Sequence, residues 1–352
     1  MKTRRWLHRP PNSNWGDFGP DDQRGRMNWV DREKVLQGVA EVKEGRTFVL
    51  SLPLDYPGGN ALNPRRHPPR IAATLRDGAR AGAQNFCYPF ANDNPAHTDV
   101  VCDDVVLLTL QYSTQWDSFA HIGSRFDADG DGRPEAVFYN GFRAGADVVA
   151  AQENPNAEAW ARFEGTRAKA LGIQNLAEHG AQGRGVLIDL HAHFGRSRHA
   201  VTWQELQEIM QADKVQVERG DIVCFYTGFA DVVLELKKNP DPKLLHQTCS
   251  GLDGRDDKLL QWVSDSGLAV LAADNYAVEL FSAAPWKSGS HAMLPLHEHC
   301  LFKNGIHLGE LWYLTELAQW LREHERNRFL LTAPPLRLPG AVGSPATPVA
   351  TV

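Results

Sequence analysis

The residues best suited to chemistry lie together at positions 111–121, where the sequence reads Gln-Tyr-Ser-Thr-Gln-Trp-Asp-Ser-Phe-Ala-His. Asp117 and His121 stand four positions apart in this segment. A carboxylate and an imidazole at that spacing can bind a divalent metal ion together or act as an acid/base pair. The alternative interpretation is a capped loop with a hydrogen-bonded histidine. The residues alone leave both open.

The elements that must position this segment follow from the hydrophobic pattern. A continuous apolar run over 104–110 precedes it and is typical of a strand buried on both faces. Similar runs at 185–190, 221–226 and 268–273 predict further strands. Helical patterns lie between or beside them. One predicted helix has its N-cap at Asp31, and another starts at a capping box of Thr202 with Glu205. The segments 256–264 and 311–322 are predicted to be amphipathic helices. Strands alternating with helices predict an α/β protein.

Aligned without gaps, the segment 111–121 resembles the H-x-G-T-H-x-D-x-P-x-H motif of the cyclase-like family, which includes bacterial kynurenine formamidase and isatin hydrolase. Thr114, Asp117 and His121 match that motif. Gln111 and Gln115 stand where the family has metal-binding histidines, and Phe119 stands where it has proline.

Further stretches resemble the family in the right order and extend the resemblance over roughly residues 14–325. They are 184–189 ("GVLLD"), 202–206 ("T-x-E-D-L"), 220–223 with 227–229 ("GD-V-L-RTGW"), Asp274-Asn275 with Glu279 ("DN-x-x-x-E"), and Leu296-His297 through Gly309-Glu310 ("LH…GI…GE").

The resemblance implies a site. Asp117 would be a metal ligand, with Gln115 and Gln111 at the positions of two more, and His297 and Glu310 would complete the set. The spacing leaves His299 open as the alternative to His297. His121 would act as the catalytic acid/base together with Asp117. Trp116 and Phe119 flank the motif and could hold a planar substrate by stacking, the alternative being plain packing.

The cofactor implied is a divalent metal ion, manganese or zinc. A Gln carbonyl oxygen is a harder and weaker ligand for zinc than imidazole, whereas oxygen donors suit manganese. The two glutamines therefore favour an ion of the manganese type, or the loss of the metal.

Two other patterns have competing interpretations. His191 and His193 form an H-x-H at a strand end, which resembles the opening of an amidohydrolase barrel, but too few residues follow for that fold. They could instead line the present site as substrate-binding residues, or simply be bonded to backbone. Asp127, Asp129 and Asp131 resemble the start of a calcium loop, with Glu135 as the only substitute for the closing glutamate; a polar hairpin turn is the alternative.

The resemblance implies a swivelling β/β/α domain with a curved mixed, barrel-like sheet wrapped by helices. We predict that residues 1–60 form an N-terminal arm, helix and first strand packed on the core. Residues 61–330 would be the catalytic domain, and 331–352 an extended C-terminal tail that is disordered or lies on a neighbour. Family members are commonly dimers or tetramers, so the resemblance implies a homodimer or homotetramer.

The composition excludes several classes of protein. The net charge is −6, so a nucleic-acid surface is not expected. No stretch of the sequence is apolar enough to span a membrane, and no secretory signal opens it. Five scattered cysteines without a CxxC pair argue against a disulfide scaffold or a structural zinc site, and indicate a cytoplasmic protein.

The expected function is metal-assisted hydrolysis of an amide, imide or lactone bond in a small cyclic or aromatic substrate. Two alternatives remain. One is a metal-free cyclase or isomerase that uses Asp117 and His121. The other is a non-catalytic small-molecule binder of the same fold.

Overall fold

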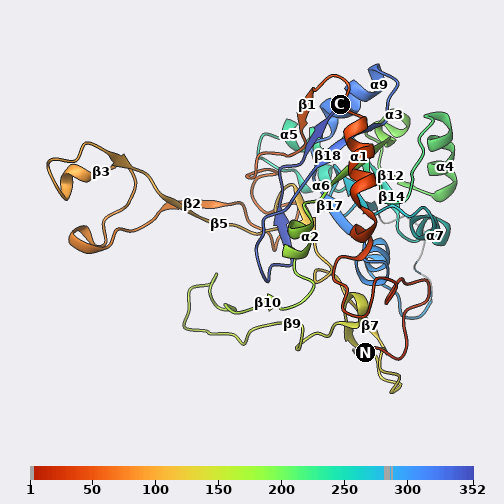
Figure 1. The fold of residues 1–352 in the computed structure, drawn as a ribbon, viewed down its shortest axis with the longest axis horizontal. Helices are drawn as coiled ribbons and strands as arrows, with labels where there is room; N and C mark the ends of the chain where they lie inside the picture. Colours follow the sequence, from red (N-terminus) through yellow and green to blue (C-terminus); the bar gives the residue numbers. More distant parts are fainter. Residues whose placement is uncertain (1–3, 281–285, 287) are drawn as a thin grey trace.

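A nine-stranded mixed sheet forms the centre of the protein in a computed structural model that describes residues 4–280, 286 and 288–352 (Figure 1). In spatial order its strands are β1 (Thr47–Val49), β20 (Val349–Thr351), β18 (Arg328–Thr332), β11 (Gln182–Asp189), β13 (Ile222–Tyr226), β15 (Val270–Ala273), β17 (His307–Glu310), β6 (Gln115–Asp117) and β19 (Gly343–Pro345). The sheet curls into a half barrel. The predicted α/β fold with a curved mixed sheet is confirmed.

The four middle strands β11, β13, β15 and β17 are parallel, and every other neighbouring pair is antiparallel. Alternate side chains of these strands enter two different hydrophobic clusters. Val186 and Ile188 pack into one, whereas Leu187 packs into the other. Both faces of the middle strands are therefore covered, which is why their sequences read as unbroken apolar runs.

Helices and a small second sheet form the connections between the parallel strands. Strands β12 (His199–Val201), β14 (Ser250–Asp253) and β16 (Glu279–Leu280) come from three successive connections and pair in parallel. The helices in these connections are α3 (Leu190–Phe194), α4 (Trp203–Ala212), α5 (Phe229–Glu235), α6 (Pro242–Leu245), α7 (Asp257–Asp265) and α8 (Pro295–His297). Helices α1 (Arg32–Ala40) and α2 (Gln174–His179) precede β11, and α9 (Thr315–Glu323) follows β17. The predicted capping box at the start of α4 is confirmed.

Helix α1 lies across β11, but the face that it buries is not its apolar face. Its apolar residues Leu36 and Val39 are exposed, and Lys34 and Gly38 are buried instead. A Cβ atom on Gly38 would lie 2.8 Å from the carbonyl oxygen of Gly183, so only glycine allows the helix this close to the strand.

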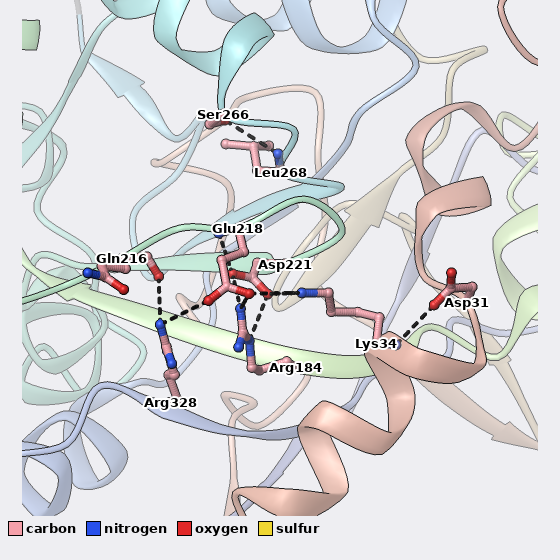
Figure 2. Close-up of polar contacts among 9 residues, drawn as sticks. All are labelled: Asp31, Lys34, Arg184, Gln216, Glu218, Asp221, Ser266, Leu268 and Arg328. Carbon is pink, nitrogen blue, oxygen red and sulfur yellow. Dashed lines mark hydrogen bonds and ion pairs between the residues drawn. The ribbon is translucent and has the colours of Figure 1, made fainter.

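A buried ion-pair network fastens the same helix to the sheet (Figure 2). The ammonium of Lys34 lies 2.9 Å from Asp221, which also receives two hydrogen bonds of 2.9 Å from Arg184. Glu218 completes the network 2.8 Å from Arg184. Asp221 is fully buried, and two cations with direct hydrogen bonds offset the cost of removing its charge from water.

The interpretation of the run 104–110 as a doubly buried strand is wrong. Among the described residues, strand β5 (Asp104–Leu107) pairs only with β2 (Arg70–Ala73), and this two-stranded ribbon projects far from the body of the molecule (Figure 1). The tip of this arm carries β3 (Tyr88–Pro89) and β4 (Val100–Val101). All four residues of β5 are exposed. A projecting ribbon can carry the same apolar pattern as a central strand, because sequence pattern does not reveal what covers it.

The predicted C-terminal tail is also corrected. Residues 343–345 and 349–351 form two strands of the central sheet, with β20 between β1 and β18 and β19 beside β6. The proline-rich composition of the segment suggested disorder, yet Ser344 and Ala350 are fully buried. The domain boundaries at 60 and 330 stay a prediction.

Two further small two-stranded sheets lie apart from the central sheet. Strands β7 (Ser124–Phe126) and β8 (Glu135–Val137) form a hairpin around the acidic turn at 127–131, which agrees with the turn interpretation. The four acidic side chains of this hairpin lie close enough to hold a cation, so calcium binding there stays a prediction. Strands β9 (Val148–Val149) and β10 (Arg167–Ala168) pair antiparallel and form the other two-stranded sheet.

In the described part of the chain, no helix is long and apolar enough to cross a membrane.

Candidate metal centre

Three side chains with metal-ligand chemistry meet at one point: Asp117, His297 and Glu310. Their ligand atoms all lie within 4.8 Å of one another, and all three residues are buried. Strand pairing brings two of them together, because β6 runs antiparallel to β17 and pairs Asp117 with Leu308 and Gln115 with Glu310. His297 is added by helix α8, which precedes β17 in the chain. The structure thus joins the first sequence motif to the last one.

Asp117 lacks partners that a buried carboxylate needs. The residue has no exposed surface, and neither of its carboxylate oxygens has a hydrogen-bond partner among the described residues. Burial raises the pKa of Asp117, and the charge of Glu310 adds to that rise, while His121, His297 and Arg66 oppose it. An orphaned buried carboxylate indicates a missing proton or cation.

His297 is held between two carboxylates. Its Nδ1 lies 2.8 Å from Glu279 and its Nε2 lies 3.1 Å from Glu310. Burial would lower the pKa of His297, but the hydrogen bonds that the imidazole donates to the two carboxylates outweigh burial and raise the pKa to about 10. The hydrogen bond between His297 and Glu310 also lowers the pKa of Glu310, although burial alone would raise it.

The choice left open between His297 and His299 is resolved by position. His299 lies apart from the cluster, with its Nε2 2.9 Å from the hydroxyl of Ser264. Burial lowers the pKa of His299 to about 3, with nearby Lys303 and Arg26 adding to the effect. His297 is therefore the histidine that faces Asp117 and Glu310.

The two glutamines at motif positions have different surroundings. The amide nitrogen of Gln115 donates to Glu310 at 2.9 Å, so Gln115 borders the cluster directly. The amide nitrogen of Gln111 lies 3.5 Å from Nδ1 of His121. Gln115 is fully buried, whereas Gln111 lines the wall of a cavity.

That cavity has a volume of about 580 Å³ and opens above the cluster. His297 and Glu310 form part of its floor, and His121 is on its wall with Nε2 3.9 Å from Asp117. The remaining wall includes Arg66 and the apolar residues Leu62, Ile122, Leu294 and Leu311. The volume lies within the range of small-molecule sites.

Four residues assigned to the substrate in the sequence analysis lie elsewhere. Trp116 has no exposed surface, donates its indole N–H to Ala333 and packs edge-on against Trp312. Phe119 is also fully buried and stacks on His307. Neither ring can therefore stack on a substrate. Both belong to the hydrophobic core, and neither lines the cavity.

His191 and His193 also lie outside the cavity, in helix α3 at the end of β11. His193 lies 2.9 Å from Asp213 and lines a different hollow, and His191 packs against Tyr226. Their assignment to the present site is therefore wrong: they are close in sequence pattern to a metal motif but end a different strand.

Two residues of the site were not assigned from sequence. Glu279 accepts hydrogen bonds from His297 and from two backbone N–H groups. The "DN-x-x-x-E" stretch contained it, and a search for a carboxylate partner of the ligand histidine would have singled it out. Arg66 reaches the cluster from the loop after β1, and nothing in its sequence neighbourhood signals that position.

The donors present fit a divalent cation. Two carboxylates and one imidazole converge, the carboxylate of Asp117 accepts no hydrogen bond from the described residues, and Glu279 orients the imidazole from outside as ligand histidines require. Oxygen donors predominate in this set, which suits manganese better than zinc.

Comparison with known proteins identifies the family of the chain. The Cyclase family, described as "Putative cyclase", matches residues 84–280, more than half of the chain, and the chain belongs to this family. That match includes Asp117, His121 and Glu279 but ends before His297 and Glu310.

The similarity to solved structures spans nearly the whole chain. A crystal structure of a novel cyclase is 29% identical, with a TM-score of 0.71, and the match covers 97% of this chain and 99% of that one. Isatin hydrolase A from Ralstonia solanacearum is 14% identical, with a TM-score of 0.52 and coverage of 90% and 95%. Isatin hydrolase A from Labrenzia aggregata is 12% identical, with a TM-score of 0.50. At identities this low, the similarity to the two isatin hydrolases shows that this chain shares their fold, and no more than the fold. No curated protein matches the chain.

Proposed function

We propose that the protein is a metal-assisted hydrolase that opens an amide, imide or lactone bond in a small cyclic or aromatic substrate. One observation carries the proposal: the unpartnered carboxylate of Asp117 lies beside His297 and Glu310 at the floor of a cavity large enough for such a substrate. The fold that the chain shares with isatin hydrolases supports the same reaction class.

Asp117, His297 and Glu310 would hold the ion, with Gln115 beside them. A divalent cation bound there supplies Lewis acidity, which polarises a carbonyl group and makes water a better nucleophile near neutral pH. Manganese is the preferred ion and zinc the alternative.

His121 would move the proton. Its Nδ1 contacts Gln111, so Nε2 remains to exchange a proton close to Asp117. The side chain is 22% exposed and lines the cavity, so a substrate can reach it. The apolar wall would hold the ring of the substrate and exclude water from it.

A second candidate is a metal-free cyclase or isomerase in which Asp117 and His121 form the acid/base pair. The hydrogen bonds of Gln115 and His297 to Glu310 favour it, because these three side chains satisfy one another without an ion. A non-catalytic binder of the same fold is the third.

The test begins with elemental analysis of the purified protein. Hydrolysis of an N-formyl anilide, a cyclic imide and a lactone is then measured with added Mn²⁺ and with chelator. The proposal predicts activity that Mn²⁺ restores and that Asp117→Asn loses. Activity that survives the chelator would favour the metal-free enzyme, and no turnover of any substrate would favour the binder.

The proposal also includes a homodimer or homotetramer located in the cytoplasm. Light scattering after size-exclusion chromatography measures the oligomeric state.

A further inference from the structure

The wall of the cavity above the candidate metal centre carries more cationic than anionic groups. Arg65 and Arg66 line it, and Glu310 is the only carboxylate among the described lining residues. Asp117 lies beneath the floor and is fully buried. A molecule entering this cavity therefore meets cations first, which favours an anionic ligand.

Arg66 is the arginine on this wall that reaches the cluster. Its Nη1 lies 3.5 Å from the amide oxygen of Gln115 and 4.0 Å from Glu310. Within the described part of the chain, these are the polar contacts of the guanidinium, and both use the same nitrogen. A guanidinium has five N–H donors in a planar fork, so most of its donors remain for a ligand.

Arg66 is not simply the counter-ion of Glu310. The separation of 4.0 Å is too long for a hydrogen bond, and Glu310 already accepts hydrogen bonds from His297 and Gln115. The Arg66 side chain is 22% exposed, so part of it faces open space.

The backbone around Arg66 is fixed before any ligand arrives. The N–H of Arg66 donates to the carbonyl of Asn63, the N–H of Arg65 donates to the side chain of Asn63, and the N–H of His67 donates to Thr109. Anchors on both sides hold the residue at the cavity wall, which lowers the entropic cost of binding.

We propose that Arg66 binds a carboxylate of the substrate, so that the substrate class is a small cyclic or aromatic acid that carries a carboxylate next to the scissile bond. This inference rests on the proposed function. Arginine pairs with a carboxylate through two parallel hydrogen bonds, which fixes the orientation of the ligand as well as its charge. The apolar side chains on the wall would take the ring.

The experiment measures binding and not turnover. Isothermal titration compares benzoate with its neutral isostere acetophenone on the intact protein, as wild type, Arg66→Gln, Arg66→Lys and Arg65→Gln. Arg65 is the matched control because it is the neighbouring cation on the same wall. We expect benzoate to bind at least ~10-fold more tightly than acetophenone, and Arg66→Gln to remove that preference. Arg66→Lys should keep part of it, and Arg65→Gln nearly all.

Equal affinity of wild type for the two probes would overturn the inference, as would unchanged benzoate binding by Arg66→Gln. Repeating the titrations with Mn²⁺ and with chelator separates two origins of binding. Benzoate binding that requires Mn²⁺ and ignores Arg66 would overturn the role of Arg66 and leave the proposed function intact. A benzoate preference that depends on Arg66 in a protein without any hydrolysis would uphold the inference and count against the proposed function.

A separate observation concerns the tip of the projecting arm. Cys87 and Cys102 flank strands β3 and β4, both are exposed, and their sulfur atoms lie 3.8 Å apart. The backbone N–H of Cys87 also donates to the sulfur of Cys102 at 3.1 Å. The other three cysteines are buried. A small movement would bring the two sulfurs to bonding distance, ~2.05 Å.

We infer that Cys87 and Cys102 form a reversible disulfide when a low-molecular-weight disulfide such as oxidised glutathione is present. One thiolate attacks the small disulfide and releases one small thiol, and the second protein thiol then displaces the other. Two protein thiols are oxidised, one small disulfide is reduced to two thiols, and the two protons end on those thiols. The bond would close the arm tip.

Incubation of the whole protein with oxidised glutathione, followed by mass spectrometry of thiol-labelled peptides, tests this. We expect wild type to lose the labels of Cys87 and Cys102 together, with a crosslinked peptide formed and glutathione released in its reduced, thiol form. Cys87→Ser should instead retain a glutathione adduct on Cys102. A stable glutathione adduct on wild type, or full labelling of both cysteines, would overturn the inference.

Discussion

Nδ1 of His297 lies 2.8 Å from the carboxylate of Glu279. The same carboxylate accepts the backbone N–H groups of Leu296 and His297 at 3.1 and 3.0 Å. Glu279 therefore fixes both the start of helix α8 and the orientation of the imidazole, and it leaves Nε2 directed at Glu310.

Glu279→Gln should lower the affinity for Mn²⁺ by ~10–100-fold, the usual cost of losing an outer partner of a ligand histidine. Glutamine offers one carbonyl oxygen where Glu279 accepts three N–H groups. Isothermal titration with Mn²⁺ measures the change. Glu298→Gln is the control, because Glu298 is next to His297 in the chain but bonds Ser124 instead. An unchanged affinity in Glu279→Gln would show that the imidazole does not bind the ion.

Restoring the family histidines should change the choice of metal. Gln115→His, alone or with Gln111→His, should tighten the binding of Zn²⁺ because imidazole is the better zinc ligand. Gln115 borders Glu310 directly and should account for most of the effect. Competition titration against a zinc chelator measures the affinity. Equal zinc affinity in the wild type and the double variant would mean that neither position faces the ion.

His121→Ala should lower turnover by ~10²–10⁴-fold, the usual contribution of a positioned acid/base group. Folding should stay intact, since the side chain is partly exposed on the cavity wall. Steady-state kinetics give the rate, and thermal unfolding checks the fold. A variant that keeps its rate but loses stability would make His121 a structural residue.

Because of Asp274, the free energy of unfolding should fall as the pH rises from mildly acidic to neutral. Burial raises the pKa of Asp274 from 3.8 to about 7, against hydrogen bonds from Thr227 that lower it. The folded protein therefore holds a proton that the unfolded chain releases near pH 4. The contribution of this proton to the free energy of unfolding is complete below about pH 4 and is lost as the pH rises through about 7, for a total on the order of 4 kcal/mol.

Asp274→Asn should remove most of that loss. Urea unfolding at pH 5 and pH 8 measures the free energy at each pH for wild type and variant. Asp99→Asn, which changes an exposed carboxylate, serves as the control. If Asp274→Asn keeps the full difference between the two pH values, the loss comes from other groups.

Much of the fold could be predicted from sequence, because the parallel strands β11, β13 and β15 each read as short unbroken apolar runs. The cap of α1 at Asp31 and the capping box at Thr202 were also visible, since capping depends on residues close in the chain. The residues of the cluster came from the resemblance to a family, since His297 and Glu310 are far from Asp117 in sequence.

What sequence could not show is which surface each element meets. Leu36 and Val39 define an apolar face of α1, yet the buried face carries Lys34, whose charge is matched by Asp221 from a distant strand. Trp116 and Asp117 are neighbours, but alternation along β6 sends one into the core and the other toward the cluster. The cavity position of Arg66 depends on the path of a loop, and no periodic pattern encodes such a path.

The place of β20 has a consequence for synthesis. Strand β1 lies at the edge of the sheet, and its only strand partner in the described structure is β20, which in turn joins it to β18. A ribosome translates β1 about three hundred residues before β20. The first strand must therefore wait, unpaired, while the segment between β1 and β20 is translated. During that time its apolar residue Phe48 needs either temporary burial against other parts of the nascent chain or the protection of a chaperone.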